Sequence, residues 1–250
     1  MSSPSTSRDH STTQSFLLIV IAASCIVAAM FGSRNSLSLT IGGINESETL
    51  DYLQISFAFA LGQLVMGAIS PFAGMIADKY GSGKTLISGI LLALLGTILI
   101  PYSTTLFTLS ISLGVISSIG LGIAGLPVVL ASVNKLIPPE KVGMAFGFVN
   151  AGSSIGQLTL APIAGLIIVY FGWVSCIVFL AIILLSVLPL SYLLRSRIEV
   201  KQLNDIATRS LLETLGIAFK TPSYIYLVAG FFVCGFHVAF IATHMPGVIE

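Results

Sequence analysis

Two long stretches of the sequence contain no ionisable side chain. Residues 85–134 and 142–194 hold no Asp, Glu, Lys, Arg or His, and only Gly, Pro and short polar turns interrupt their apolar character. A helix at the surface of a water-soluble core needs polar residues at helical spacing to face solvent, and these stretches lack them. Runs of this length and composition predict several membrane-spanning helices in series.

The composition of the whole chain agrees with this. Of the 250 residues, 55% are hydrophobic and only 8% are charged, whereas soluble domains carry about 25% charged residues. The net charge of +1 gives no reason to expect a nucleic-acid partner. Cys25, Cys176 and Cys234 lie far apart in apolar runs and match no metal-binding spacing, so we expect packing roles for them. We expect no metal, no cofactor and no enzymatic activity, because the chain shows no nucleophile–base pair and no metal cluster.

The predicted fold is an all-α integral membrane protein, because only helices satisfy every backbone polar group within such segments. A span needs about 20 residues. The predicted organisation is a cytoplasmic tail (1–15), a six-span bundle (16–194), a cytoplasmic linker with amphipathic helical character (195–222) and a seventh span within 223–250. The predicted spans are 16–41, 51–77, 84–101, 105–134, 142–169, 172–194 and 223–248.

The basic residues predict the orientation in the membrane. With a cytoplasmic N-terminus, every Lys and Arg except Arg34 falls in an inside segment, and the outside loops 42–50, 102–104 and 170–171 hold none. This asymmetry follows the positive-inside rule. We therefore predict a multi-pass protein of the cell membrane, plasma or bacterial inner, with its N-terminus in the cytoplasm.

Residues 71–81 (PFAGMIADKYG) and 162–172 (PIAGLIIVYFG) align without a gap. Pro71 matches Pro162, and Gly81 matches Gly172. The two copies are three spans apart, an odd number, so they cross the membrane in opposite directions. Inverted three-span repeats are typical of secondary transporters.

The stretch DKYGSGKT (78–85) ends like a phosphate-binding loop, but it does not fit one. Asp78 stands where the first Gly of that loop belongs, and a long apolar run precedes it where a short strand is needed. Residues 74–84 instead resemble the loop motif between spans 2 and 3 of the major facilitator superfamily, Gly-x-x-x-Asp-[Arg/Lys]-x-Gly-[Arg/Lys]-[Arg/Lys]. The matching positions are Gly74, Asp78, Lys79 and Gly81. Ser82 and Gly83 stand where two basic residues are usual, and Lys84 comes one place late.

The resemblance covers the whole chain. Residues 234–250 (CGFHVAFIATHMPGVIE), the Gly32-Ser33-Arg34 end of span 1 and the Gly-rich span 5 are most similar to the bacterial monocarboxylate/oxalate–formate branch. The resembled fold has twelve spans, so the resemblance implies a fragment that lacks the C-terminal half of the same protein. It also implies that the motif around Asp78 stabilises an outward-open state and so acts as a conformational gate.

Arg34 is the first candidate for a substrate contact. The apolar run from Phe16 to Phe31 is about 24 Å long as a helix, too short to span, so the helix should continue past Arg34. An arginine inside the membrane is costly and usually faces a cavity or a partner. One interpretation is a contact for an anionic substrate, and the other is a side chain that reaches the outer headgroups.

Span 5 and span 7 supply the remaining candidates. Asn150, Ser153, Ser154 and Gln157 form one polar stripe on a helix, which either lines the substrate path or makes hydrogen bonds between helices. The glycines of span 5 (Gly143, Gly147, Gly152 and Gly156) and the residues Gly114, Ser118 and Gly122 of span 4 predict close helix packing.

His237 and His244 lie two turns apart on one face of span 7. A mid-membrane histidine is a candidate for proton transfer, whereas the alternative is a neutral side chain bonded to a backbone carbonyl. The sequence therefore predicts a secondary active transporter of small organic anions of the monocarboxylate kind, by alternating access, with proton coupling or anion exchange. The alternatives are a facilitator for another small solute, such as a sugar or drug, and a non-transporting half-transporter or assembly protein.

Overall fold

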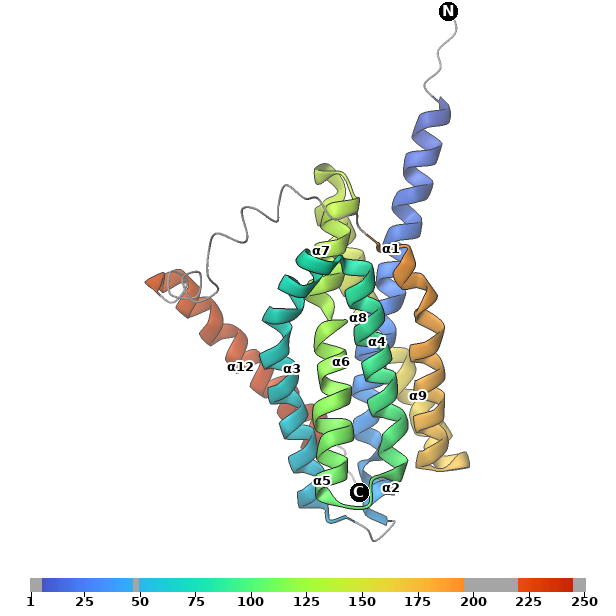
Figure 1. Ribbon diagram of the computed structural model, residues 1–250, viewed down its shortest axis with the longest axis vertical. Coiled ribbons are helices and arrows are strands. Elements are labelled where there is room, and N and C mark those ends of the chain that lie inside the picture. Colours follow the sequence, from blue (N-terminus) through green and yellow to red (C-terminus); the bar gives the residue numbers. More distant parts are fainter. Residues whose placement is uncertain (1–5, 47–49, 196–219, 245–250) are drawn as a thin grey trace, which may run out of the picture. The chain divides into compact units, whose positions relative to one another are not determined.

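The computed structural model describes residues 6–46, 50–195 and 220–244 (Figure 1). The chain divides into two units, Met1–Arg197 and Ile198–Glu250. Among the described residues of the first unit, six helical segments are long and apolar enough to cross a membrane: Phe16–Asn45, Tyr52–Tyr80, Ser82–Tyr102, Leu106–Leu136, Pro139–Phe171 and Trp173–Tyr192. Each lies within about one helical turn of the predicted span. The described residues contain no strand, so the all-helical fold is confirmed for this part of the chain.

The six spans are built from the following elements. Span 1 is α1 (Thr6–Leu37), η1 (Ser38–Thr40) and α2 (Ile41–Glu46); span 2 is α3 (Tyr52–Tyr80); span 3 is α4 (Ser82–Leu99) with η2 (Ile100–Tyr102); span 4 is α5 (Leu106–Leu109), the π-helical η3 (Ser110–Ser117), α6 (Ser118–Ile123) and α7 (Leu126–Leu136); span 5 is α8 (Pro139–Phe171); span 6 is α9 (Trp173–Val187) with η4 (Pro189–Tyr192). Helix α1 begins at Thr6, inside the segment predicted as a tail.

Span 4 differs from the single helix that the sequence predicted. Helix α6 ends at Ile123, Gly125 is extended with φ −70° and ψ 174°, and α7 begins at Leu126. Pro127 lies in the first turn of α7, where a missing N–H costs nothing, whereas a proline inside a continuous helix would remove a hydrogen bond and clash with the preceding turn. Gly125 and Pro127 together therefore break the span into two parts.

The sequence repeat is a repeat of structure. Gly81 and Gly172 are the two described glycines with positive φ, 89° and 83°. Each ends a long helix by donating its N–H to the carbonyl four residues earlier, and the next helix begins at the following residue. Ala73 and its counterpart Ala164 are both fully buried. Glycine suits these corners because side chains disfavour positive φ.

The second unit contains α12 (Pro222–His244), an apolar helix at the place of the predicted span 7. Residues 245–248 of that predicted span lie outside the described residues. So does most of the predicted amphipathic linker, from residue 196 to residue 219.

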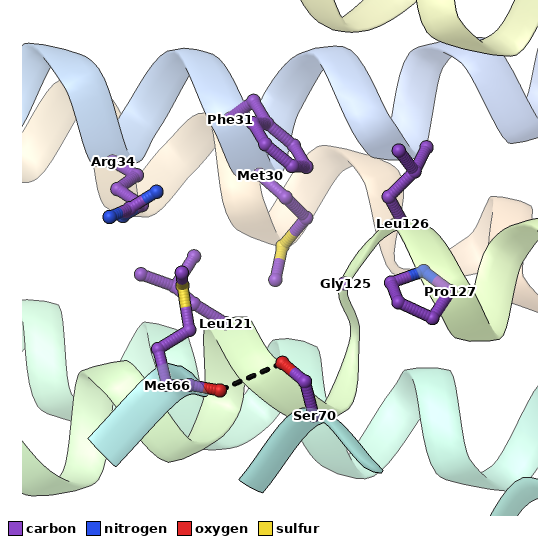
Figure 2. Close-up of a pocket in the computed structure, with 9 residues that line it drawn as sticks. All are labelled: Met30, Phe31, Arg34, Met66, Ser70, Leu121, Gly125, Leu126 and Pro127. Atoms are coloured by element: carbon purple, nitrogen blue, oxygen red, sulfur yellow. Dashed lines mark hydrogen bonds between the residues drawn. The ribbon is translucent and has the colours of Figure 1, made fainter. Parts of the chain in front are cut away.

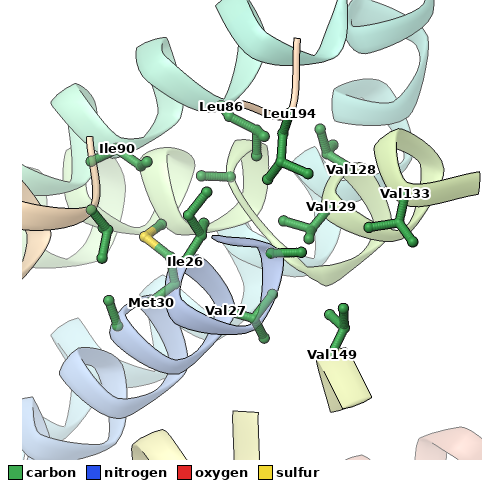
Figure 3. Packing of buried hydrophobic residues seen from close by; sticks show 14 of the residues in the cluster. Ile26, Val27, Met30, Leu86, Ile90, Val128, Val129, Val133, Val149 and Leu194 are labelled. Carbon is green, nitrogen blue, oxygen red and sulfur yellow. The ribbon is translucent and has the colours of Figure 1, made fainter. Parts of the chain in front are cut away.

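Two apolar clusters form the core of the six-span unit. The larger contains Ile26, Val27 and Met30 from α1, Leu86 and Ile90 from α4, Val128, Val129 and Val133 from α7, Val149 from α8, and Leu194 (Figure 3). The second brings Leu37 and Ile41 of span 1 together with Ile177 and Leu180 of α9.

Small residues let the helices approach closely, as in other membrane bundles. A Cβ at Gly156 would overlap the backbone of Ala28 on α1, and one at Gly152 would lie 2.8 Å from Cβ of Ser24. These two glycines confirm the predicted packing face. Gly143 and Gly147 were predicted to share it, but among the described residues a Cβ at either position would meet nothing within 4 Å.

Span 4 packs as its small residues predicted. A Cβ at Gly122 would overlap the side chain of Ile69 on α3, and the hydroxyl of Ser118 lies against Gly62 of the same helix. Helix α6 is therefore held tightly against α3.

Candidate functional site

A pocket of about 70 Å³ lies where span 4 is broken. It is lined by Met30, Phe31 and Arg34 from α1, Met66 and Ser70 from α3, and Leu121, Gly125, Leu126 and Pro127 from span 4 (Figure 2). Most of these side chains are apolar, and Arg34 is the one cation among them. The pocket therefore offers an apolar wall with a single positive charge at its edge.

Arg34 has a polar partner across the helix interface. Its Nη2 donates a hydrogen bond to Oε1 of Gln63 on α3. The side chain is half-buried, and its guanidinium extends towards the pocket side of α1 (Figure 2). A charged group within a span needs a cavity or a polar partner, and Arg34 has both. This geometry favours a buried polar role for Arg34 over a side chain that reaches the outer headgroups.

The partner Gln63 was not among the residues predicted from the sequence. It is an amide side chain within an otherwise apolar stretch of span 2, and this polar residue among apolar ones could have identified Gln63 as a candidate from the sequence. Because α1 and α3 are separate elements, their relative register decides which polar groups meet, and the sequence does not give that register directly.

The predicted gating residues form a corner between two helices. Gly74, Asp78 and Lys79 belong to α3, Gly81 is the corner itself, and Lys84 is in the first turn of α4. Carboxylate Oδ1 of Asp78 lies 2.6 Å from Nζ of Lys135, in the last turn of α7. The exposed fractions of these two side chains are 36% and 29%. Asp78 therefore ties the end of span 2 to the end of span 4.

The other polar residues of this corner make different contacts from those of Asp78. The ammonium of Lys79 lies 5.4 Å from the ring centroid of Tyr80, and Lys84 is exposed. Hydroxyl Oγ of Ser82 donates to the carbonyl of Leu194, at 2.9 Å. The last of these contacts fixes the corner against the end of the sixth span.

The polar stripe of α8 does not line the pocket. Nδ2 of Asn150 donates to the carbonyl of Phe146, and Nε2 of Gln157 donates to the carbonyl of Ser153, so both amides bond to their own helix. Asn150 and Ser154 are exposed on the surface of the six-span unit. These contacts do not show the hydrogen bonds between helices that were one interpretation of the stripe, and they leave an exposed polar face on α8.

The histidines of span 7 belong to the second unit. His237 is exposed on α12. His244 is the last residue of α12, and its side chain lies outside the described residues. Among the side chains that the structure describes, no group of three or more His, Cys, Asp or Glu could hold a metal ion.

The sequence matches the family described as Major Facilitator Superfamily over residues 17–250. The chain belongs to this family of membrane transporters. It is 29% identical over 147 residues to human monocarboxylate transporter 12, which covers 59% of this chain and 28% of the relative. It is 27% identical over 178 residues to human monocarboxylate transporter 2, covering 71% and 37%.

A third relative is named for a different transported solute. The riboflavin transporter RibZ of Clostridioides difficile is 28% identical over 159 residues, covering 64% of this chain and 34% of the relative. The matched part of the chain spans about a third of the length of these three relatives.

Proposed function

We propose that the protein is a secondary active transporter of small organic anions, of the monocarboxylate class, working by alternating access with proton coupling or anion exchange. The observation that carries the proposal is Arg34, which lines the pocket between α1, α3 and span 4 and is oriented by Gln63. A fixed cation beside an apolar wall suits a ligand with one carboxylate and a short apolar tail. The names of the two human relatives support the same class.

The stripe of Asn150, Ser154 and Gln157, in which Asn150 and Ser154 are exposed and Gln157 is half-buried, is proposed to line the substrate path from another side. This stripe and the pocket belong to adjacent helices, because α8 packs along α1 through Gly152 and Gly156. Polar side chains exposed on a membrane helix face protein or water and not lipid. The stripe therefore supports a polar passage beside α8.

A second candidate substrate class is a larger, ring-containing solute such as a flavin. The similarity to a riboflavin transporter supports it.

Uptake by liposomes that contain the full-length protein separates the two substrate classes. Labelled monocarboxylates of two to six carbons are measured with excess unlabelled riboflavin or sugar as competitor. We expect saturable monocarboxylate uptake that neither competitor inhibits. Saturable uptake of riboflavin or of a sugar, without carboxylate uptake, would contradict the proposed class.

The N-terminus is proposed to be cytoplasmic. Basic residues lie together at one end of the six-span unit, which supports this orientation by the positive-inside rule. Three contacts place them there: the ion pair of Lys135 with Asp78, the contact of Arg195 with Gly83, and the stacking of Lys141 on Phe16.

In a background without native cysteines, we expect Glu46→Cys to react with an impermeant thiol reagent in intact cells and Lys84→Cys to react only after permeabilisation. Lys84 is a suitable reporter because it is exposed, whereas Gly83 is buried. The reverse labelling pattern would show the opposite orientation.

His237 is proposed to carry the coupled proton. Imidazole side chains often carry protons in proteins, and a co-transported proton removes the cost of moving an anion through a low-dielectric passage. We expect His237→Gln to abolish accumulation of substrate driven by a pH gradient while exchange of substrate across the membrane continues. His244→Gln is the matched variant, because His244 lies on the same face of the helix, two turns away. Unchanged pH-driven accumulation in His237→Gln would assign the proton to another group.

A further inference from the structure

Arg34 is a cation within span 1 whose partner carries no charge. Its Nη2 donates to the amide oxygen of Gln63. Among the side chains that the structure describes, no carboxylate forms an ion pair with Arg34, and the ion pair found there joins Asp78 to Lys135. Ionisable residues inside membrane spans commonly pair with one another. Arg34 instead has a hydrogen-bonded donor and a positive charge that no neighbouring acid cancels.

Gln63 lies on the pocket face of α3. Met66 and Ser70 line the pocket, and they follow Gln63 by three and seven residues, so the three side chains share one face of the helix. The hydroxyl of Ser70, the other polar side chain of the lining, is bonded to the carbonyl of Met66 (Figure 2). A ligand that binds Nη2 of Arg34 must place its oxygen where the oxygen of Gln63 lies.

A glutamine of a span can form a hydrogen bond with its own helix. In α8, Nε2 of Gln157 donates to the carbonyl of Ser153, four residues earlier. The equivalent acceptor for Gln63 is the carbonyl of Phe59, one turn back along α3. The loss of its bond to Arg34 would therefore be partly offset within α3.

We propose that Gln63 is a neutral stand-in for the ligand. It accepts the hydrogen bond of Arg34 while the pocket is empty, and an incoming anion with planar oxygens, such as a carboxylate, displaces it. The proposal rests on the proposed function in taking Arg34 as the group that binds the carboxylate. The amide keeps the guanidinium oriented without cancelling its charge, whereas an acid on α3 would cancel it. Competition by Gln63 lowers the affinity for the anion, which suits a carrier that releases its ligand in every cycle.

The contact is tested by the reactivity of Arg34. Phenylglyoxal is a neutral reagent that modifies guanidinium groups, and mass spectrometry of the full-length protein in lipid nanodiscs gives the rate at Arg34. We expect Gln63→Met to raise this rate about three- to tenfold, because a hydrogen bond to a charged group is lost. Gln63→Glu should lower it at least about tenfold, because a charge-assisted pair replaces the neutral one. Arg195, which is exposed, is the reference within each sample and should react at an unchanged rate.

The displacement is tested by the anion concentration that halves the rate at Arg34, with butyrate and nitrate as probes. Gln63→Met has no competing acceptor, so we expect half-protection at an about tenfold lower concentration, the scale of one hydrogen bond to a charged group. Gln63→Asn, whose amide is one methylene shorter, should lower it by a smaller factor and keeps the test available should Gln63→Met not fold. Gln54→Leu is the matched control on α3, because Gln54 bonds to the backbone N–H of Asp51, and we expect the parent value.

Three results would overturn the proposal. The first is an unchanged rate of Arg34 modification in Gln63→Met. The second is half-protection at an equal or higher anion concentration in Gln63→Met and Gln63→Asn, which would make Gln63 a residue that only holds Arg34 in place. The third is a lack of protection by either anion in the parent protein and in every variant. Protection by nitrate and by no carboxylate, with the expected shift in Gln63→Met, would reject the proposed substrate class and support the stand-in.

Discussion

Replacing Arg34 with glutamine is expected to lower carboxylate uptake at least about 30-fold at low substrate concentration. Removing one partner of a hydrogen-bonded charge pair costs about 2–5 kcal/mol, and 1.4 kcal/mol corresponds to a factor of ten. The glutamine amide can still form a hydrogen bond with Gln63, the partner that Arg34 has in this structure. The variant should therefore insert and fold, and initial rates of labelled carboxylate uptake measure the loss.

Two controls separate the charge of Arg34 from its shape and from the general charge of the protein. Arg34→Lys keeps the positive charge but loses the planar two-pronged donor, so we expect an intermediate rate. Lys141→Gln removes a cation that stacks on Phe16 far from the pocket, and we expect the parent rate. Arg34→Gln uptake within twofold of the parent protein would mean that Arg34 is a structural residue.

Replacing Gly156 with alanine is expected to lower the melting temperature by roughly 2–12 °C. The added methyl would overlap the backbone of Ala28, so α1 and α8 would have to move apart. Overpacking of this kind costs about 1–3 kcal/mol, and each kcal/mol shifts the melting temperature by about 2–4 °C in a chain of this size. Gly156→Leu should prevent recovery of folded protein altogether.

Gly147→Ala, on the same helix, is the matched control. A methyl there meets nothing within 4 Å, and alanine favours helix over glycine by about 1 kcal/mol, so the melting temperature should stay the same or rise. Cys176 is fully buried in α9 and can report unfolding through a thiol-reactive dye once Cys25 and Cys234 are replaced. Equal melting temperatures for the two alanine variants would contradict the close contact between α1 and α8.

The spans and corners could be predicted from the sequence because they depend on local properties. A run without ionisable residues determines a membrane helix whatever its neighbours are. Gly81 and Gly172 could be matched because a helical corner with positive φ requires glycine at one definite position. The alignment of the two repeats therefore predicted a structural equivalence that the backbone confirms.

The contacts between helices were harder to predict. Gly147 and Gly156 have the same chemistry, yet only Gly156 meets α1, because the rotation of α8 about its axis is set by packing along the whole helix. Gln63 and Lys135 were missed as partners of Arg34 and Asp78 for the same reason.

The break in span 4 had a local signal that was not used. The sequence Gly125-Leu126-Pro127 combines a flexible residue with one that cannot continue a helix. Hydropathy alone does not detect this break, since the apolar character continues through it. The pocket depends on the break, so it could not be predicted from the spans.

We propose that the full-length protein carries small organic anions and recognises their charge. The most direct test compares a small labelled carboxylate with its uncharged amide, in liposomes that contain the full-length protein and under both a pH gradient and a gradient of unlabelled carboxylate. The amide keeps the size and shape of the acid but has no charge for Arg34 to bind. We predict saturable uptake of the carboxylate under at least one gradient and no saturable uptake of the amide. Equal uptake of the two solutes, or no uptake of carboxylates of any length, would contradict the claim.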